Sequence, residues 1–211
     1  MSLLEYTEFF GDTILDLTIK HILLFGVSFI GASILGVAIG VVSYRFSGLR
    51  FLTPVVNILQ ATPEIVLLAI SIPFLGIGYV GALVPLFIKG ILPIMQNTTS
   101  GLAGVDPNIK EAARGMGMSE LTVLLRVELI NAAPVILAGM RVSAVMLVSV
   151  ITLTAYIGVE SLGTLILQGI ARMDANPLLI GSGLSAILAI VVNQAIVIVE
   201  NLAMRRVGVR S

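Results

Sequence analysis

Five long apolar segments constrain the fold of this chain more than any other feature of its sequence. A run of about 18 or more apolar residues is long enough to cross the hydrocarbon core of a bilayer as a helix. The composition agrees, because 57% hydrophobic and 11% charged residues leave too little charge to cover a soluble domain of 211 residues. The predicted spans lie near residues 22–43, 52–74, 80–97, 132–157 and 178–202.

These segments predict an all-α, polytopic membrane protein. Helices satisfy their own backbone hydrogen bonds in lipid, whereas the strands of a barrel would give shorter, alternating segments. Glycines recur at intervals of about one turn in the first predicted span and are expected to let neighbouring helices approach closely: Gly26, Gly31, Gly36 and Gly40.

The distribution of basic residues predicts the orientation of the spans, because loops rich in Lys and Arg stay in the cytoplasm. Such residues follow the first, third and fifth spans: Arg45, Arg50, Lys110, Arg114, Arg126, Arg205, Arg206 and Arg210. We therefore expect a cytoplasmic loop at 106–131, a cytoplasmic tail at 206–211 and an N-terminus outside. Residues 1–20 mix acids with apolar side chains, which predicts an extracytoplasmic amphipathic helix on the outer surface and leaves 21–205 as the membrane domain.

The loop at 106–131 reads as two short amphipathic helices. Asp106 is placed to cap the first and Pro107 suits its first position, while Gly115 and Gly117 interrupt it and Ser119 caps a second. Small or unbranched side chains at the break form a surface that a groove on another protein accepts: Ala112, Ala113, Met116 and Met118. On composition alone, an ordinary interfacial loop is an equally open interpretation.

The spacing in this loop carries more information than its composition. Glu111-Ala112-Ala113 is followed after three residues by Gly117, and after nine more by Val127-Glu128-Leu129. This pattern resembles the EAA loop of permease subunits in bacterial ATP-binding-cassette (ABC) importers. The family pattern has Ile where this chain has Val127 and Pro where it has Ile130; Pro134 follows and is expected to take over the break into the next span.

Longer segments resemble the branch of that family that imports glycine betaine, choline, carnitine and related osmoprotectants. These segments are "LPIMQNTTSGLAGVDPNIKEAARGMGM", "PVILAGMRVSA", "YIGVESLG" and "QATPEIVLLAISIPFLGIG". The resemblance implies a MetI-like fold of a type I importer in the bacterial cytoplasmic (inner) membrane, with residues 21–205 as the permease domain. It also implies an ATPase-coupling site made of Glu111, Ala112, Ala113, Gly115, Met116, Gly117 and Met118.

The same resemblance implies partners. Two permease subunits, identical or different, form the pathway, a cytoplasmic ABC ATPase dimer binds the coupling loops, and an extracytoplasmic binding protein delivers the solute. The sequence contains no Gly-x-x-x-x-Gly-Lys-Ser/Thr phosphate loop. We therefore expect this chain not to be an enzyme and to hold no cofactor, with ATP and Mg²⁺ bound by the partner ATPase, and we expect no nucleic acid partner.

Two charges inside the predicted spans mark a candidate pathway, because charged side chains in a membrane are costly and are usually paired or functional. Glu64 and Lys89 are both predicted near mid-membrane, where they are placed to form an ion pair, and Pro63 and Pro93 loosen the two helices. One interpretation places Glu64 on the route of a quaternary ammonium solute, together with Lys89, Gln60 and Pro63. A buried packing pair, or a Lys89 that reaches outward to the interface, remains an alternative.

Other polar residues in or near the spans support weaker expectations. Arg141 is expected to anchor the cytoplasmic end of its span or to pair with Glu128, with a role in the pathway as the less favoured alternative. His21 is expected to lie at the outer interface. The chain has no Cys, a single His and no Trp, so we expect no metal site and no aromatic cage for an ammonium group. Selectivity is therefore expected to reside in the binding protein.

Two other functions remain in competition. A secondary transporter would use Glu64 and Lys89 for ion coupling, but it leaves the EAA spacing unexplained and no inverted repeat with broken helices is evident. Within the importers, a methionine or polar amino-acid permease would share the fold and the loop. An intramembrane enzyme is disfavoured, because the spans carry no Ser-His, paired Asp or metal-ligand cluster.

Overall fold

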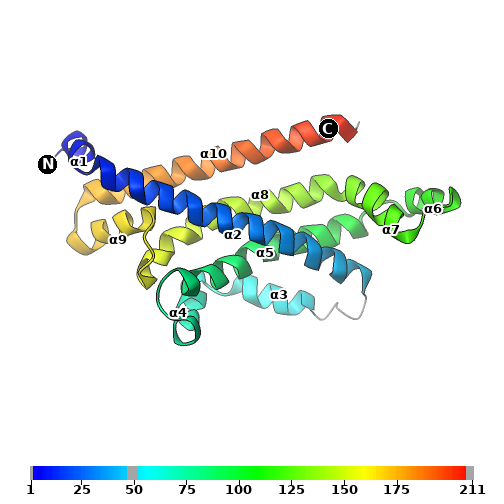
Figure 1. Cartoon of the computed structure of the whole chain (residues 1–211), viewed down its shortest axis with the longest axis horizontal. Coiled ribbons are helices and arrows are strands. Elements are labelled where there is room, and N and C mark those ends of the chain that lie inside the picture. The colour runs from blue at the N-terminus through cyan, green and yellow to red at the C-terminus, as the bar shows by residue number, and fades with distance from the viewer. Residues whose placement is uncertain (1, 47–51, 208–211) are drawn as a thin grey trace.

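The computed structural model describes residues 2–46 and 52–207, which are helical throughout apart from short connections and contain no strand. Figure 1 shows an elongated bundle with α1 and α9 at one end and α6 and α7 at the other. The helices are α1 (Leu3–Phe9), α2 (Gly11–Arg45), α3 (Leu52–Ala61), α4 (Glu64–Leu75), α5 (Tyr79–Ala103), α6 (Pro107–Gly115), α7 (Glu120–Val123), α8 (Leu129–Leu153), α9 (Leu162–Arg172) and α10 (Ala175–Val207). A π-helical turn, Leu124–Glu128, joins α7 to α8, and a 3-10 turn, Thr154–Ile157, follows α8. Arg50 and Arg210 lie outside the described residues, as do the side chains of Arg205 and Arg206.

Four helical segments are long and apolar enough to cross a membrane: Gly11–Arg45, Tyr79–Ala103, Glu120–Ile157 and Ala175–Leu202. The predicted span at 52–74 is different, because α3 and α4 meet at an angle of 99°. The predicted loosening near Pro63 is thus a sharp bend, and the predicted number of five spans holds if the bent pair is one span. Pro63 accounts for the bend, since it has no N–H to donate and disfavours helical geometry in the preceding Thr62.

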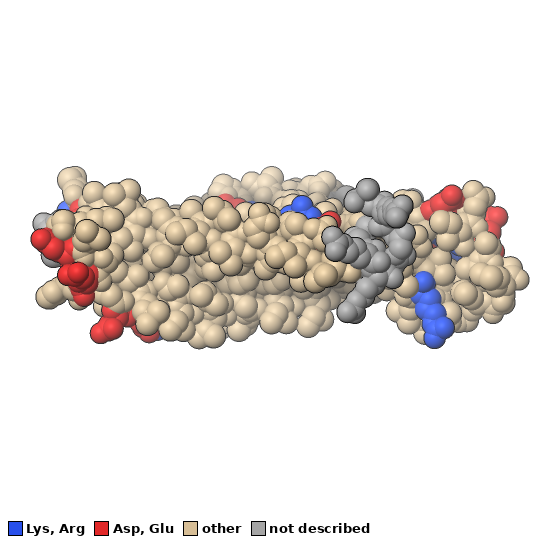
Figure 2. Space-filling view, turned by 90° about the horizontal axis from the view of Figure 1, so that it is seen from above, with Lys and Arg blue, Asp and Glu red and all other residues tan. Residues whose placement is uncertain are grey.

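The N-terminal segment also departs from expectation. The break falls at Phe10 instead of near residue 20, and α2 runs without interruption from Gly11 to Arg45. Acidic side chains gather on the α1 end of the molecule, and the long face between the two ends carries almost no charge (Figure 2). His21 lies within this long helix and is completely buried against the bundle. The prediction that it lies at the outer interface concerns its depth in the membrane and stays a prediction.

A stripe of mostly small side chains on α2 allows it to pack closely against α5. The buried residues of α2 are spaced three or four positions apart: Leu17, His21, Leu24, Ser28, Ala32, Gly36 and Gly40. The last four of these are small, and they lie in the half of the helix nearer α6. A Cβ added at Gly36 would lie 2.8 Å from Ile94 Cβ, and one added at Gly40 would lie 2.5 Å from Thr98 Cβ. Gly31 meets Phe87 in the same way, whereas Gly26 has nothing within 4 Å, so the packing prediction is confirmed for three of the four glycines and wrong for Gly26.

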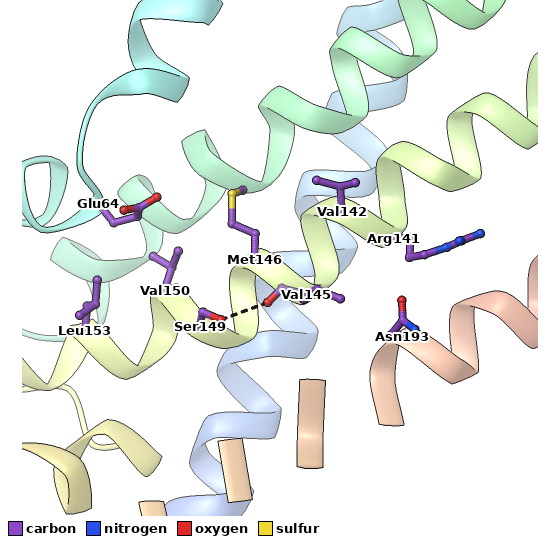
Figure 3. A pocket seen from close by; sticks show the side chains of 9 residues that line it. All are labelled: Glu64, Arg141, Val142, Val145, Met146, Ser149, Val150, Leu153 and Asn193. Carbon is purple, nitrogen blue, oxygen red and sulfur yellow. Dashed lines mark hydrogen bonds between the residues drawn. The ribbon is translucent and has the colours of Figure 1, made fainter. Parts of the chain in front are cut away.

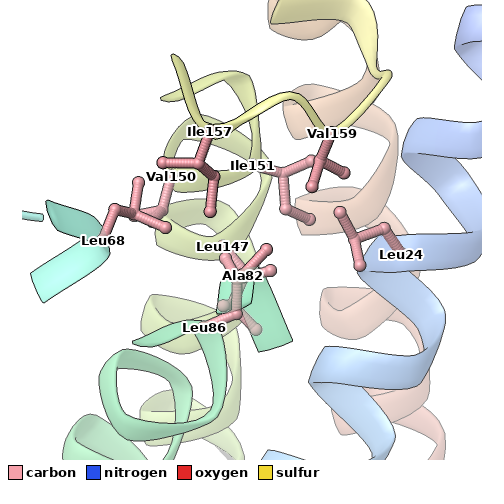
Figure 4. Close-up of a cluster of buried hydrophobic side chains, with 9 residues drawn as sticks. All are labelled: Leu24, Leu68, Ala82, Leu86, Leu147, Val150, Ile151, Ile157 and Val159. Atoms are coloured by element: carbon pink, nitrogen blue, oxygen red, sulfur yellow. The ribbon is translucent and has the colours of Figure 1, made fainter. Parts of the chain in front are cut away.

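The main apolar core lies where α2, α4, α5 and α8 meet the 3-10 turn (Figure 4). Its buried members are Leu24, Leu68, Ala82, Leu86, Leu147, Val150, Ile151, Ile157 and Val159. Interhelical hydrogen bonds supplement this packing: the Ser143 hydroxyl donates to the Gly90 carbonyl at 2.8 Å. The short helix α4 is thus fixed to the bundle through Leu68, and the bend before α4 has a defined geometry.

Candidate functional site

The loop that contains the EAA pattern forms a compact helical unit at one end of the bundle. The Asn108 N–H donates to Asp106 Oδ1 at 2.8 Å and Pro107 is the first residue of α6, so the predicted start is confirmed. The helix ends at Gly115, and Gly117 adopts a left-handed conformation with φ +84°. The Thr122 N–H donates to the Ser119 hydroxyl at 3.3 Å, as expected for a cap.

Most of the predicted coupling residues face away from the bundle. Ala113 is buried and Met118 half-buried, whereas Met116 is 72% exposed. The remaining members are exposed: Glu111, Ala112, Gly115 and Gly117. Helix α6 therefore presents a ridge of small and flexible side chains with an acid beside them, which is a shape that another protein's groove can receive.

The second half of the loop is not a separate helix. From Glu120 the chain passes through α7 and the π-helical turn Leu124–Glu128 directly into α8, so the expected break near Pro134 is wrong. A π-helical turn inserts an extra residue into a helix and is frequent at functional sites. One continuous helical segment, Glu120–Ile157, thus connects the neighbourhood of α6 to the opposite end of the bundle.

A partly buried cluster of three polar side chains, with Glu128 at its buried end, lies beneath α6. Lys110 Nζ lies 3.7 Å from Glu128 Oε1 and donates to the Tyr44 hydroxyl at 2.9 Å and to the Leu102 carbonyl at 3.1 Å. The Tyr44 hydroxyl in turn donates to Glu128 Oε1 at 3.1 Å. Sequence reasoning missed this cluster, although an acid next to an apolar helix in a basic loop was a signal for it.

The expected pair of Arg141 with Glu128 is wrong, because Arg141 pairs with Glu200 of α10 instead. Arg141 and Glu128 are 13 positions apart, which is about 20 Å along one continuous helix. Arg141 therefore lies too far along α8 to reach Glu128.

A second charge cluster lies on the surface of the loop. Arg114 Nε donates to Glu120 Oε1 at 2.7 Å, and Arg45 Nη1 donates to Glu120 Oε2 at 3.2 Å. The hydrogen bond that Arg114 donates to the Glu120 carboxylate raises the pKa of the Arg114 guanidinium. All three side chains are well exposed to solvent, so these pairs are screened and weakly stabilising.

The break between α3 and α4 contains the second candidate site. Lys89 of α5 is 1% exposed, and its ammonium donates to the carbonyls of Gln60 at 3.0 Å and Thr62 at 2.5 Å. Its third partner is Glu64 Oε1 at 3.3 Å, so the predicted ion pair is confirmed and the alternative of an outward-reaching Lys89 is wrong. Lys89 thus satisfies carbonyls that the bend leaves without helical partners.

The other face of Glu64 borders a cavity of about 810 Å³ (Figure 3). Most of the lining comes from α8, with Glu64 of α4 at one end of the cavity and Arg141 of α8 at the other. Valines and Met146 lie between them. The lining residues are Glu64, Arg141, Val142, Val145, Met146, Ser149, Val150, Leu153 and Asn193. Gln60 and Pro63, the other predicted pathway residues, belong to the bend behind Glu64: Gln60 supplies a carbonyl to Lys89, and Pro63 precedes α4.

The wall of this cavity is mostly apolar, with the Glu64 carboxylate at one end and the Arg141 guanidinium at the other. Across residues 2–46 and 52–207, no group of three His, Asp or Glu side chains is arranged to hold a metal ion.

The fold and these two sites define a polytopic helical membrane protein with an exposed helical loop at one end and a broken helix beside a cavity. Residues 32–205 match the family of the binding-protein-dependent transport system inner membrane component, and the chain belongs to that family. It is a permease subunit of the ABC importer type.

Individual relatives agree along nearly the whole chain. The chain is 38% identical to the carnitine transport permease protein OpuCB of Listeria monocytogenes, with 88% of this chain and 86% of that protein covered. It is 35% identical to the choline transport system permease protein OpuBB of Bacillus subtilis, with 94% and 92% covered. Among solved structures, the inward-facing MetNI methionine ABC transporter gives a TM-score of 0.81 at 23% identity, covering 90% of this chain and 96% of that one, which supports the MetI-like fold.

Proposed function

We propose that this chain is the permease subunit of an ATP-driven importer for quaternary-amine osmoprotectants such as glycine betaine, choline and carnitine. The observation that carries the substrate class is the identity of 34 to 38%, over most of the chain, to relatives named for carnitine, choline and glycine betaine transport. The cavity offers such a solute a mostly apolar wall and, at the Glu64 end, a carboxylate for its ammonium group, while Arg141 lies at the opposite end.

The proposal includes the partners of the chain. An ABC ATPase dimer binds the exposed ridge of α6, a second permease subunit completes the pathway, and a binding protein delivers the solute at the α1 end. ATP and Mg²⁺ bind the ATPase and not this chain. The α6 end then lies in the cytoplasm and the α1 end outside, an orientation supported by the basic residues near α6 and the acids near α1.

The continuous helical segment from Glu120 to Ile157 supplies a physical route for coupling. Its beginning lies next to α6, and its later residues, from Arg141 to Leu153, line the cavity. Closure of the ATPase dimer moves α6, and the movement reaches the wall of the cavity through this helix. The pathway then opens alternately to the two sides of the membrane.

Within this pathway, Glu64 attracts the ammonium group of the solute. Glu64 is held by Lys89 on one side and borders the cavity on the other, so a cation in the cavity shares its carboxylate with Lys89. We expect Glu64→Gln to lower the rate of uptake while assembly stays normal, with the exposed acid Glu8 replaced by Gln as the control. Unchanged uptake by an assembled Glu64→Gln complex would remove Glu64 from the pathway.

The experiment that tests the function is ATP-dependent uptake of radiolabelled glycine betaine, choline and carnitine into proteoliposomes. The vesicles contain this subunit with its second permease subunit, its ATPase and its binding protein. We expect uptake of at least one of these solutes, and its loss together with ATPase association in Glu111→Ala. Glu8→Ala, which removes an exposed acid at the opposite end of the bundle, is the matched control.

Two outcomes would overturn parts of the proposal. An assembled complex that hydrolyses ATP and takes up none of the three solutes would move the substrate to methionine or a polar amino acid. Uptake that follows an ion gradient without ATP would replace the importer by a secondary transporter.

A further inference from the structure

Helix α6 is attached to the rest of the molecule by a small contact. Of its nine residues, Ala113 alone is buried and Lys110 is half-buried, while the others are exposed. These two residues are three positions apart and lie on the same face of the helix. Any force on α6 therefore reaches the bundle mainly through the backbone connections and these two side chains.

Lys110 makes contacts to three different parts of the bundle. Its ammonium reaches Tyr44 in the last turn of α2, Leu102 at the end of α5 and Glu128 in the π-helical turn before α8. The ammonium also lies 5.3 Å from the centre of the Tyr44 ring. A single side chain of α6 thus binds the ends of three long helices.

The carboxylate of Glu128 depends on the ammonium of Lys110 as its counter-ion. Its side chain is 1% exposed, and its Oε2 has no hydrogen-bond partner among the described residues. Burial of a carboxylate is costly unless a cation lies close, and Lys110 is the cation that contacts it. Glu128 is therefore stabilised when α6 is docked against the bundle and destabilised when α6 moves away.

We propose that Tyr44, Lys110 and Glu128 are positioning residues that join α6 to the ends of α2, α5 and α8, so that the four helices move as one unit when the ATPase closes. This inference rests on the proposed docking of α6 on the ATPase. The surface cluster of Arg45, Arg114 and Glu120 spans the same elements, but its members are exposed, and exposed pairs hold their geometry weakly.

Two variants weaken the contacts among Tyr44, Lys110 and Glu128 to different degrees. Lys110→Met keeps most of the apolar stem and removes the charge, which leaves Glu128 unpaired. Tyr44→Phe removes only the hydroxyl that accepts from Lys110 and donates to Glu128, and it preserves the ring. Arg45→Gln is the matched control, because Arg45 lies next to Tyr44 in α2 and contacts the same loop from the exposed side.

The first measurement is the distance between α6 and α2 in the assembled importer. The chain contains no Cys, so spin labels attach only to the introduced Asn108→Cys on α6 and Ile34→Cys on α2, before assembly with the partners. In the parent protein and in Arg45→Gln, we expect a narrow distance distribution that stays the same between the nucleotide-free and the ATP-trapped complex. In Lys110→Met and Tyr44→Phe, we expect the distribution to shift or broaden when ATP is trapped, more strongly in Lys110→Met.

The second measurement is the number of solute molecules imported per ATP hydrolysed. We expect this ratio to fall several-fold in Lys110→Met and less in Tyr44→Phe, while the ATPase stays bound. If the three residues only stabilise the fold, fewer complexes will form, but the surviving ones will show the parent distances and the parent ratio, and the inference is then wrong.

The distance measurement also separates this inference from the proposed function. It uses trapped ATP and needs no transported solute, so a wrong substrate class would leave its outcome unchanged. Should Lys110→Met not assemble, Tyr44→Phe decides, and an unchanged distance distribution in that variant would overturn the inference.

Discussion

Lys89 and Glu64 meet at the break between α3 and α4, where Lys89 Nζ lies 3.3 Å from Glu64 Oε1. The same ammonium donates to the carbonyls of Gln60, in the last turn of α3, and of Thr62, which follows α3. One side chain from α5 therefore fixes both halves of the bent span. It also sets the position of the carboxylate that borders the cavity.

Replacement of Lys89 by Met is expected to destabilise the bend. Each carbonyl left without a donor costs about 1–3 kcal/mol, and Glu64 loses its counter-ion. Thermal unfolding of the purified subunit in detergent measures the effect as a lower midpoint. Lys20→Met is the control, because Lys20 pairs with the exposed acids Asp16 and Glu160, and we expect little change there. Equal stability of the two variants would show that Lys89 does not hold the bend.

The sequence was sufficient for the features that depend on local chemistry. Apolar runs predict spans because a bilayer accepts little else, and Asp106 and Ser119 predict helix starts because capping is a contact between close neighbours. The Glu64–Lys89 pair was predictable too, since two charges at similar depth in a membrane have few other partners.

The features that were missed depend on the direction in which a helix points. Pro63 indicated a weakened helix, but a bend of 99° is fixed by contacts of α4 with the core and of Lys89 with the freed carbonyls. The burial of His21 was not foreseen, because the face of α2 that packs on the bundle follows from its contacts with other helices. The partners of Glu128 were missed because Lys110 and Tyr44 come from α6 and α2, and their approach to Glu128 depends on how these helices pack.

Close packing of α2 on α5 predicts opposite effects at two glycines of one helix. A Cβ at Gly36 would lie 2.8 Å from Ile94 Cβ and 3.2 Å from the Ile91 carbonyl oxygen, so Gly36→Ala is expected to separate the helices and lower stability. Gly26 has nothing within 4 Å, and Gly26→Ala is expected to be neutral or slightly stabilising, since Ala favours a helix by up to about 1 kcal/mol. The measurement is the midpoint of thermal unfolding of each variant in detergent. Equal midpoints for Gly36→Ala and Gly26→Ala would show that α2 does not pack closely on α5 at Gly36.

The pair of Arg141 with Glu200 predicts non-additive effects between α8 and α10. Arg141→Leu and Glu200→Leu each leave a charge unpaired among apolar helices, so each single variant is expected to be less stable than the parent. The double variant removes both charges and is expected to be more stable than the sum of the singles predicts, with an interaction free energy of about 0.5–3 kcal/mol. Strict additivity in the unfolding free energies would show that the two side chains do not interact.

Gly115 and Gly117 lie two positions apart in the loop but have different backbone requirements. Gly115 is the last residue of α6, and a Cβ there meets nothing within 4 Å, so Gly115→Ala is expected to leave α6 intact. Gly117 has φ +84°, where a side chain costs about 1–2 kcal/mol, so Gly117→Ala is expected to shift the turn that joins α6 to α7.

Co-purification of the ATPase with each variant measures the difference between Gly115→Ala and Gly117→Ala. We expect weaker association for Gly117→Ala and parent-like association for Gly115→Ala, because the turn after α6 sets the angle at which its ridge faces the partner. The reverse order of the two variants would mean that the space around Gly115, and not the conformation of Gly117, determines docking.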